Sequence, residues 1–147
     1  MTHTFLIESG QWIIRGNWLD KNQNQIPVTG GTIITWDDPN WFTMKTKLVF
    51  SSDEKPDITF EYKGHLPTKQ IQYTYVLQNS FLGQIEGEGW IAPESIVQRY
   101  WVLGDPLRHN GFDSLFYIDE NTYNLSSGIM KGNYLESAME AILQRSL

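Results

Sequence analysis

The side chains that could do chemistry in this chain are few and far apart. The three histidines, His3, His65 and His109, fall in separate segments, without the close i, i+2 or i, i+4 spacing that brings metal ligands together. The sequence has no cysteine and no Gly-x-Ser-x-Gly elbow, so it offers neither a thiolate nor an activated serine as nucleophile. We therefore predict no metal site and no cofactor, and we interpret the histidines as surface loop residues.

Two carboxylates and one arginine are the remaining candidates for catalysis. Glu86 and Glu88 lie two residues apart in the run 81–91, so they share one face of a strand. A buried pair could bind a cation or divide the roles of acid and base, whereas a solvated pair is an ordinary strand face. Arg99 shares the strand parity of Trp101, and on an inward face its guanidinium would need a carboxylate or an anionic ligand. The sequence leaves open whether the protein is an enzyme.

Aromatic side chains with polar tips supply a second kind of chemistry, the recognition of a mostly apolar ligand by one or two hydrogen bonds. Trp, Tyr and Phe make up 14% of the chain. The alternative for each ring is ordinary packing in a β-sheet core. The ligand-binding residues that we predict are Trp18, Tyr73, Tyr75, Arg99, Tyr100 and Trp101.

The elements that must position these residues are short runs of alternating apolar and polar side chains, the pattern of half-buried strands. Polar segments with turn residues, such as 37–40 (DDPN), separate the runs. The last segment differs, because apolar residues recur at helical spacing behind Asn133, a good helix N-cap. That stripe is Leu135, Ala138, Met139, Ile142 and Leu143, and the alternating runs are 11–18, 28–36, 41–50, 58–62, 70–77, 81–91, 96–103, 112–118 and 122–131.

This order of elements predicts a mainly β fold. We expect one domain over residues 1–147, an antiparallel up-and-down β-barrel of about 8–10 strands with one C-terminal α-helix at about 133–146. Closure into a barrel hides the strand edges that would otherwise be exposed. Gly16, Gly83, Gly87 and Gly89 either allow the strands to bend or leave room in the barrel interior.

The composition of the chain argues against two classes of binding partner, nucleic acids and membranes. The net charge is −6, and the 11 Lys and Arg residues are scattered, whereas a non-specific nucleic-acid binder needs a basic face. No apolar run approaches the ~20 residues of a membrane span, and residues 1–8 lack the pattern of a signal peptide. We predict a cytoplasmic protein that binds neither nucleic acid nor membrane.

The amino end reads Gly10-Gln11-Trp12, and a Gly-x-Trp at the start of the first strand resembles the signature of the calycin group, which includes lipocalins and fatty-acid-binding proteins. The chain is also similar to small bacterial calycin-like domains of unknown activity. The resemblance implies that Trp12 packs at the closed end of the barrel under a basic residue from a late strand, for which Arg99 and Lys131 are the candidates. Nitrobindin-like haem proteins of this group use a late-strand histidine, and no histidine follows His109.

Three functions follow. We favour the binding of a small, partly apolar molecule inside the barrel. An isomerase-like or lyase-like enzyme that uses Glu86, Glu88 or Arg99 is the first alternative. The second is a protein-interaction module, in which a sheet face or the terminal helix packs against another subunit, a homodimer included.

Overall fold

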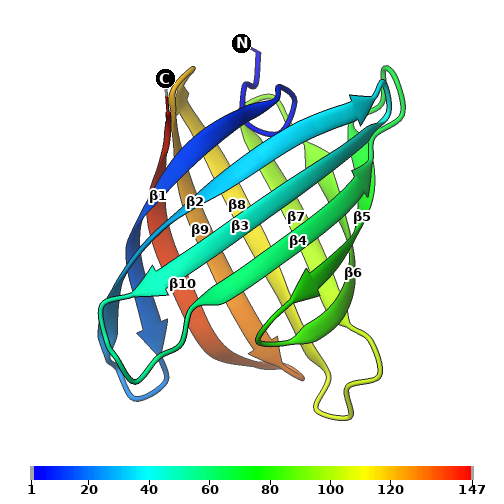
Figure 1. The fold of residues 1–147 in the computed structure, drawn as a ribbon. Helices are drawn as coiled ribbons and strands as arrows, with labels where there is room; N and C mark the ends of the chain where they lie inside the picture. Colours follow the sequence, from blue (N-terminus) through cyan, green and yellow to red (C-terminus); the bar gives the residue numbers. More distant parts are fainter. Residues whose placement is uncertain (1, 147) are drawn as a thin grey trace.

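Ten antiparallel strands form a closed barrel (Figure 1) in the computed structural model, which describes residues 2–146. Each strand pairs with the next one along the chain, and β10 pairs with β1, so every strand has two neighbours. The barrel thereby has no open sheet edge. The strands are β1 (Gly10–Asp20), β2 (Gln25–Asp38), β3 (Trp41–Phe50), β4 (Ile58–His65), β5 (Gln72–Asn79), β6 (Gly83–Ile91), β7 (Ser95–Val102), β8 (His109–Asp119), β9 (Thr122–Lys131) and β10 (Tyr134–Arg145).

Alternation of side chains along each strand divides the inside of the barrel from the outside. In β5, for example, Tyr73, Tyr75 and Leu77 are buried, whereas Thr74 and Val76 between them are exposed. Successive side chains of a strand point to opposite faces, so one parity of every strand fills the interior. The inward parity of β7 carries Ile96, Gln98 and Tyr100, and its outward parity carries Arg99 and Trp101.

The predicted C-terminal helix at about 133–146 is wrong, because this segment is strand β10, Tyr134–Arg145. No helix long and apolar enough to cross a membrane occurs in residues 2–146. Strand β10 closes the barrel by pairing with β9 on one side and with β1 on the other. A helix here would leave the edges of β1 and β9 without hydrogen-bond partners, and the free energy of pairing two edges outweighs the helical preference of the segment.

A β-bulge explains why this strand resembles a helix in sequence. The pairing of β10 with β9 shifts register between Leu135 and Ser137, and such a bulge changes which parity points inward. Beyond it, Met139 and Leu143 are buried, whereas Ile142 is exposed on the outer wall. Apolar residues on both faces of the strand therefore imitate the spacing of an amphipathic helix.

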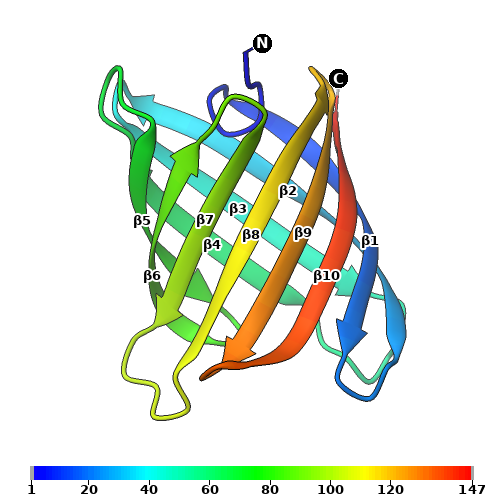
Figure 2. The same ribbon diagram turned by 180° about the vertical axis from the view of Figure 1, so that it is seen from behind.

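The segment before β1 closes one end of the barrel, which we call the plug end (Figures 1 and 2). Phe5 and Leu6 are buried there. His3 is also buried and donates from Nε2 to the carbonyl of Ala92 at 2.7 Å, while its Nδ1 accepts from the hydroxyl of Tyr123 at 2.8 Å. The interpretation of His3 as a surface residue is therefore wrong, since its ring fixes the plug to Tyr123 of β9 and to Ala92 in the β6–β7 loop.

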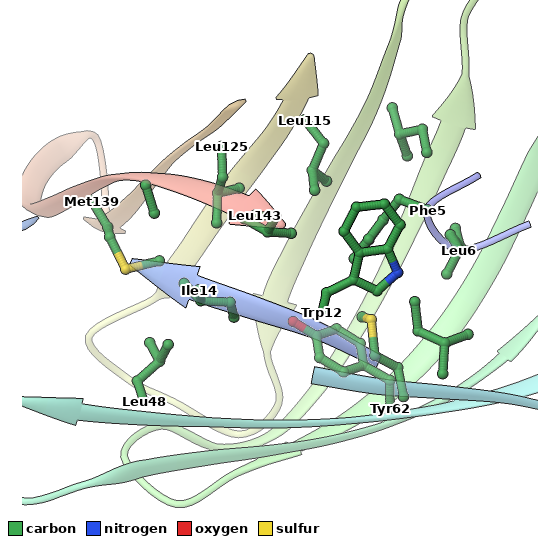
Figure 3. Close-up of a cluster of buried hydrophobic side chains, with 14 of the residues drawn as sticks. Phe5, Leu6, Trp12, Ile14, Leu48, Tyr62, Leu115, Leu125, Met139 and Leu143 are labelled. Carbon is green, nitrogen blue, oxygen red and sulfur yellow. The ribbon is translucent and has the colours of Figure 1, made fainter. Parts of the chain in front are cut away.

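Trp12 packs at this same end, in contact with the ring of Phe5 at 5.3 Å between centroids (Figure 3). The guanidinium of Arg145 lies 5.8 Å from the centre of the Trp12 ring and forms an ion pair with Glu8 at 2.9 Å. The basic residue beside Trp12 therefore comes from β10. Arg99 is on the outer wall, and Lys131 ends β9 at the opposite end of the barrel, so neither candidate from the sequence is this partner.

Candidate functional site

The barrel contains a cavity. The volume within which the centre of a water molecule fits is ≈ 80 Å³. A single water needs about 10–15 Å³ by this measure, so the space holds several waters or one small ligand. It is bounded by Leu6 at the plug end and reaches Trp18 near the opposite end, which we call the far end. The wall is mostly apolar and aromatic. Its polar side chains are Thr32, Thr46, Tyr62, Tyr73, Asn79, Gln98, Tyr100, Asp113 and Ser127.

Four of these polar side chains, Tyr73, Gln98, Asp113 and Ser127, form one row across the five neighbouring strands β5 to β9. Tyr73 pairs with Gly89, which pairs with Gln98, and Gln98 pairs with Asp113. Because Gly89 has no side chain, the Tyr73 hydroxyl reaches over β6 and donates to Oε1 of Gln98 at 2.8 Å. Nε2 of Gln98 then donates to Oδ2 of Asp113 at 2.7 Å. Ser127, the cross-strand partner of Asp113 on β9, continues the row into the cavity wall.

Glycines on the inner wall leave the space into which the aromatic rings of neighbouring strands pack. A Cβ at Gly89 would lie 2.2 Å from Cζ of Tyr73, and a Cβ at Gly87 would lie 2.3 Å from Cζ of Tyr75. The interior room left by these glycines is therefore filled by rings of the adjacent strand. A second row of cross-strand pairs alternates in this way around the wall: Phe42, Gly64, Tyr75, Gly87, Tyr100 and Gly111.

Asp113 is the ionisable acid of the cavity. Its position in mid-strand on the inward parity of β8 removes it from bulk water, and the surface it retains borders the cavity. Burial raises the pKa of the Asp113 carboxyl to about 6, against a smaller lowering by the hydrogen bond from Gln98. A carboxyl with this pKa exchanges a proton near neutral pH, which an ordinary aspartate does not.

The tyrosines around Asp113 stay protonated. Burial, followed by the charge of Asp113, raises the pKa of Tyr73 and of Tyr100 far above the ordinary value for a phenol. Tyr62 and Tyr75 are shifted in the same direction, again chiefly by burial. Each tyrosine therefore carries a neutral hydroxyl. Tyr73 and Tyr100 line the cavity.

The structure divides the predicted ligand-binding residues into two groups. Trp18, Tyr73 and Tyr100 line the cavity, and Tyr75 is buried on the same inner wall with its ring over Gly87. Arg99 and Trp101 are exposed on the outer face of β7 and cannot reach a ligand in the cavity.

Sequence reasoning missed the two residues that complete the polar row, Gln98 and Asp113. Gln98 points to the same side of its strand as Tyr100, and Asp113 points to the same side as Leu115. Knowing which side faces inward would have placed both residues in the barrel interior.

The carboxylate pair of the enzyme alternative is not in the cavity. Glu86 and Glu88 are exposed on the outer face of β6. Their solvated positions provide neither the desolvation nor the enclosure that acid–base catalysis by such a pair would need. The catalytic roles suggested for Glu86, Glu88 and Arg99 therefore have no support in the geometry.

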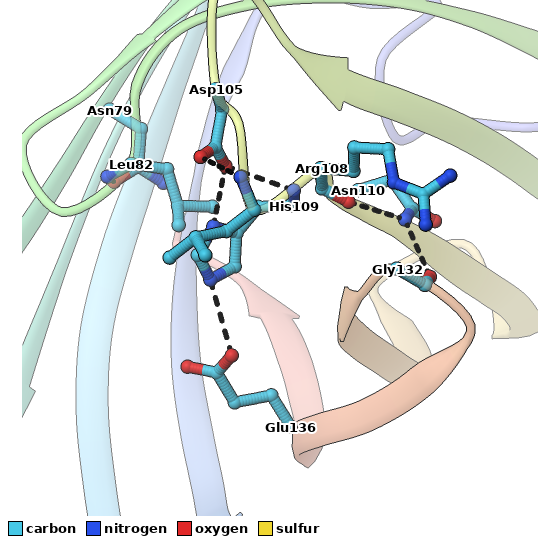
Figure 4. Close-up of polar contacts among 9 residues, drawn as sticks. Asn79, Leu82, Asp105, Arg108, His109, Asn110, Gly132 and Glu136 are labelled. Atoms are coloured by element: carbon cyan, nitrogen blue, oxygen red, sulfur yellow. Dashed lines mark hydrogen bonds and ion pairs between the residues drawn. The ribbon is translucent and has the colours of Figure 1, made fainter.

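A cluster of ionisable side chains lies on the rim of the far end (Figure 4). His109, the first residue of β8, contacts Asp105 through Nδ1 at 2.5 Å and Glu136 through Nε2 at 3.1 Å. Its side chain is only 15% exposed, so it is not the surface residue that the sequence suggested. The carboxylates contact opposite sides of the ring, and no group of three or more possible metal ligands converges anywhere in residues 2–146. The cluster joins the β7–β8 loop to β10.

The β3–β4 loop folds across the same end of the barrel through Lys55. Its ammonium lies 4.5 Å from the ring centre of Trp18, 4.8 Å from that of Phe50 and 5.6 Å from that of Phe81. Contact with aromatic faces is favourable for a cation. Trp18 also lines the cavity, so Lys55 joins the β3–β4 loop to a residue of the cavity wall.

Comparison with known proteins identifies the fold. No protein-family model and no curated protein matches the sequence. Among solved structures, the chain is similar to Rv2717c from M. tuberculosis, with a TM-score of 0.69 and 14% identity over 94% of this chain and 92% of that one. It is also similar to the S-type phycobiliprotein lyase CPES from Guillardia theta, with a TM-score of 0.66 and 14% identity over 94% and 88% of the two chains. At such identities the likeness shows a shared closed-barrel fold.

Proposed function

We propose that the protein binds a small, largely apolar molecule inside the barrel. The observation that carries this proposal is a cavity inside the barrel with a mostly apolar and aromatic wall and a hydrogen-bonded row of polar groups, Tyr73, Gln98 and Asp113. Ligand sites commonly combine an apolar enclosure with a few fixed polar groups that orient the ligand. The likeness to the phycobiliprotein lyase supports the fold, and the ligand class is argued from the cavity itself.

Filling the cavity tests this function. Ser127→Phe places a ring in the cavity beside Asp113, and Ser126→Phe places the same ring on the exposed outer face of the same strand. We expect benzyl alcohol to shift the backbone amide signals of cavity residues in NMR spectra of the unaltered chain and of the Ser126 variant. The Ser127 variant should show no such shifts. Equal shifts in both variants would place the ligand elsewhere and refute the proposal.

The membership in the calycin group is part of the same proposal. A Gly-x-Trp opens β1, Trp12 packs at the closed end, and Arg145 of the last strand lies against its ring. This arrangement agrees with the resemblance drawn from the sequence and supplies the basic residue that the sequence left unassigned. The cytoplasmic location, the homodimer and the lack of nucleic-acid or membrane partners remain predictions.

Proton transfer by Asp113 is a second candidate function. A carboxyl in a cavity with a pKa raised to about 6 can give and take a proton near neutral pH. Any molecule that co-purifies with the protein can be incubated in D₂O with the unaltered chain and with Asp113→Asn. Catalysis predicts deuterium in the ligand only with the unaltered chain, as measured by mass spectrometry. Equal labelling by both chains would exclude this role.

A further inference from the structure

We propose that the cavity selects ligands that carry a protonated nitrogen on an apolar frame, such as a primary amine or a protonated heterocycle. This inference rests on the proposed function, since it names the chemical class of the molecule bound.

The charges of the wall favour a cation. Among the described residues that line the cavity, Asp113 is the ionisable acid, and none is a lysine, arginine or histidine. A ligand carboxylate would meet the Asp113 carboxylate in a medium of low dielectric, where repulsion of like charges is strong. A ligand ammonium would instead give the buried carboxylate the partner that it lacks. The wall therefore disfavours a fatty acid and favours an amine.

The geometry leaves Asp113 able to bind such a group. Gln98 donates to Oδ2 of Asp113, and a carboxylate accepts more than one hydrogen bond. The residual accessible surface of Asp113 borders the cavity, so the carboxyl has room for a further donor. Ser127 lies directly across from Asp113 on β9 and lines the same part of the wall. An ammonium has three donors, so it can contact the carboxylate together with a neighbouring hydroxyl.

The aromatic surroundings add to the preference. Tyr62, Tyr73 and Tyr100 line the cavity, and Tyr75 packs on the same wall. These four tyrosines are the titratable groups around Asp113, and each is neutral at pH 7.5, since an ordinary phenol is already protonated there and burial raises the pKa further. The faces of such rings attract cations, and their hydroxyl oxygens accept hydrogen bonds from an ammonium. The same rings give an aromatic or aliphatic frame an apolar wall to pack on.

Three probes that share one frame test the inference: benzylamine, benzyl alcohol and benzoate, each titrated at pH 7.5 by isothermal calorimetry or NMR. We expect benzylamine to bind at least tenfold more tightly than benzyl alcohol, and benzoate at least tenfold more weakly. In Asp113→Asn the affinity for benzylamine should fall to the level of the alcohol. Glu86→Gln makes the same change of charge on the outer wall and should leave all three affinities unchanged.

The outcomes separate this inference from the function on which it rests. Binding of benzyl alcohol without a preference for the amine refutes the choice of ligand class and supports the cavity as a binding site. Failure of all three probes to bind refutes the proposed function and the inference with it. Should Asp113→Asn not fold, the ranking of the probes on the unaltered chain still decides, because the three differ only in their polar group.

Discussion

At the scale of single residues, Asp113 lowers the stability of the fold at neutral pH and also provides a polar group to the cavity. The folded state holds the neutral acid more strongly than the unfolded state does, because burial raises its pKa from 3.8 to about 6. The protonated Asp113 carboxyl therefore makes its full contribution to the stability of the folded state below pH 4. That contribution is lost as the pH rises through about 6 and the carboxyl ionises. A group that weakens the fold at neutral pH is typical of a site kept for binding or catalysis.

Replacing Asp113 by Asn should therefore stabilise the protein in a pH-dependent way. The amide stays neutral and can still accept the hydrogen bond from Gln98. We expect the free energy of unfolding of Asp113→Asn, relative to the unaltered chain, to rise from near zero at pH 4 to about 3 kcal/mol at pH 8. Urea unfolding at a series of pH values measures this difference. A difference that is the same at every pH would show that Asp113 titrates as an ordinary aspartate.

At the scale of strands, we expect the stability of the fold to be sensitive to one methyl group added at a glycine that lies under a tyrosine ring. In Gly89→Ala the new Cβ would lie 2.2 Å from Cζ of Tyr73, so the ring must move and its hydrogen bond to Gln98 is lost. We expect the free energy of unfolding to fall by about 1–3 kcal/mol. Gly31→Ala is the matched control, because its Cβ would come no closer than 3.4 Å to the oxygen of Trp12. Equal effects in both variants would mean that strand propensity, and not ring packing, governs these positions.

The β3–β4 loop should depend on Lys55. Burial lowers the pKa of this lysine, and the charge of Asp20 partly opposes the shift. Lys55→Gln removes the cation from the three rings at the far end, a loss of about 0.5–2 kcal/mol. We expect faster amide hydrogen exchange in residues 51–57, with the barrel strands unchanged. Lys45→Gln, on an exposed position of β3, should leave exchange in the loop as it is. A loop that stays equally protected without Lys55 would contradict its role as a tether.

The elements also show how far the sequence predicts this protein. Alternation located the strands up to Lys131, because a half-buried strand imposes a period of two on its side chains. It failed in β10, where the bulge at Leu135 and the apolar outer residue Ile142 produced a helical spacing. The inward parity of β7 could not be read from sequence, because both of its faces carry aromatic rings. That ambiguity placed Arg99 and Trp101 in the predicted site and left out Gln98.

At the scale of the whole molecule, the two ends of the barrel set the length of the cavity. The plug holds Phe5 and Leu6 inside one end, while Trp18 lines the cavity near the other end, under the Lys55 side chain of the β3–β4 loop. The plug is hydrogen-bonded to segments far away in sequence, Tyr123 of β9 and Ala92 of the β6–β7 loop. The cavity is therefore complete only when the first residues are docked, which couples the stability of the plug to the shape of the site.

Shortening a plug side chain should therefore change both stability and ligand size. Leu6 is 2% exposed and lines the cavity, so Leu6→Ala should lower the free energy of unfolding by about 2–4 kcal/mol. The space it opens should accept a longer ligand, and we expect 4-ethylbenzylamine to bind this variant more tightly, relative to benzylamine, than it binds the unaltered chain. Leu107→Ala, at a leucine that is 51% exposed, should change neither quantity. Loss of stability without a change in the preferred ligand length would mean that the plug supports the fold but does not bound the site.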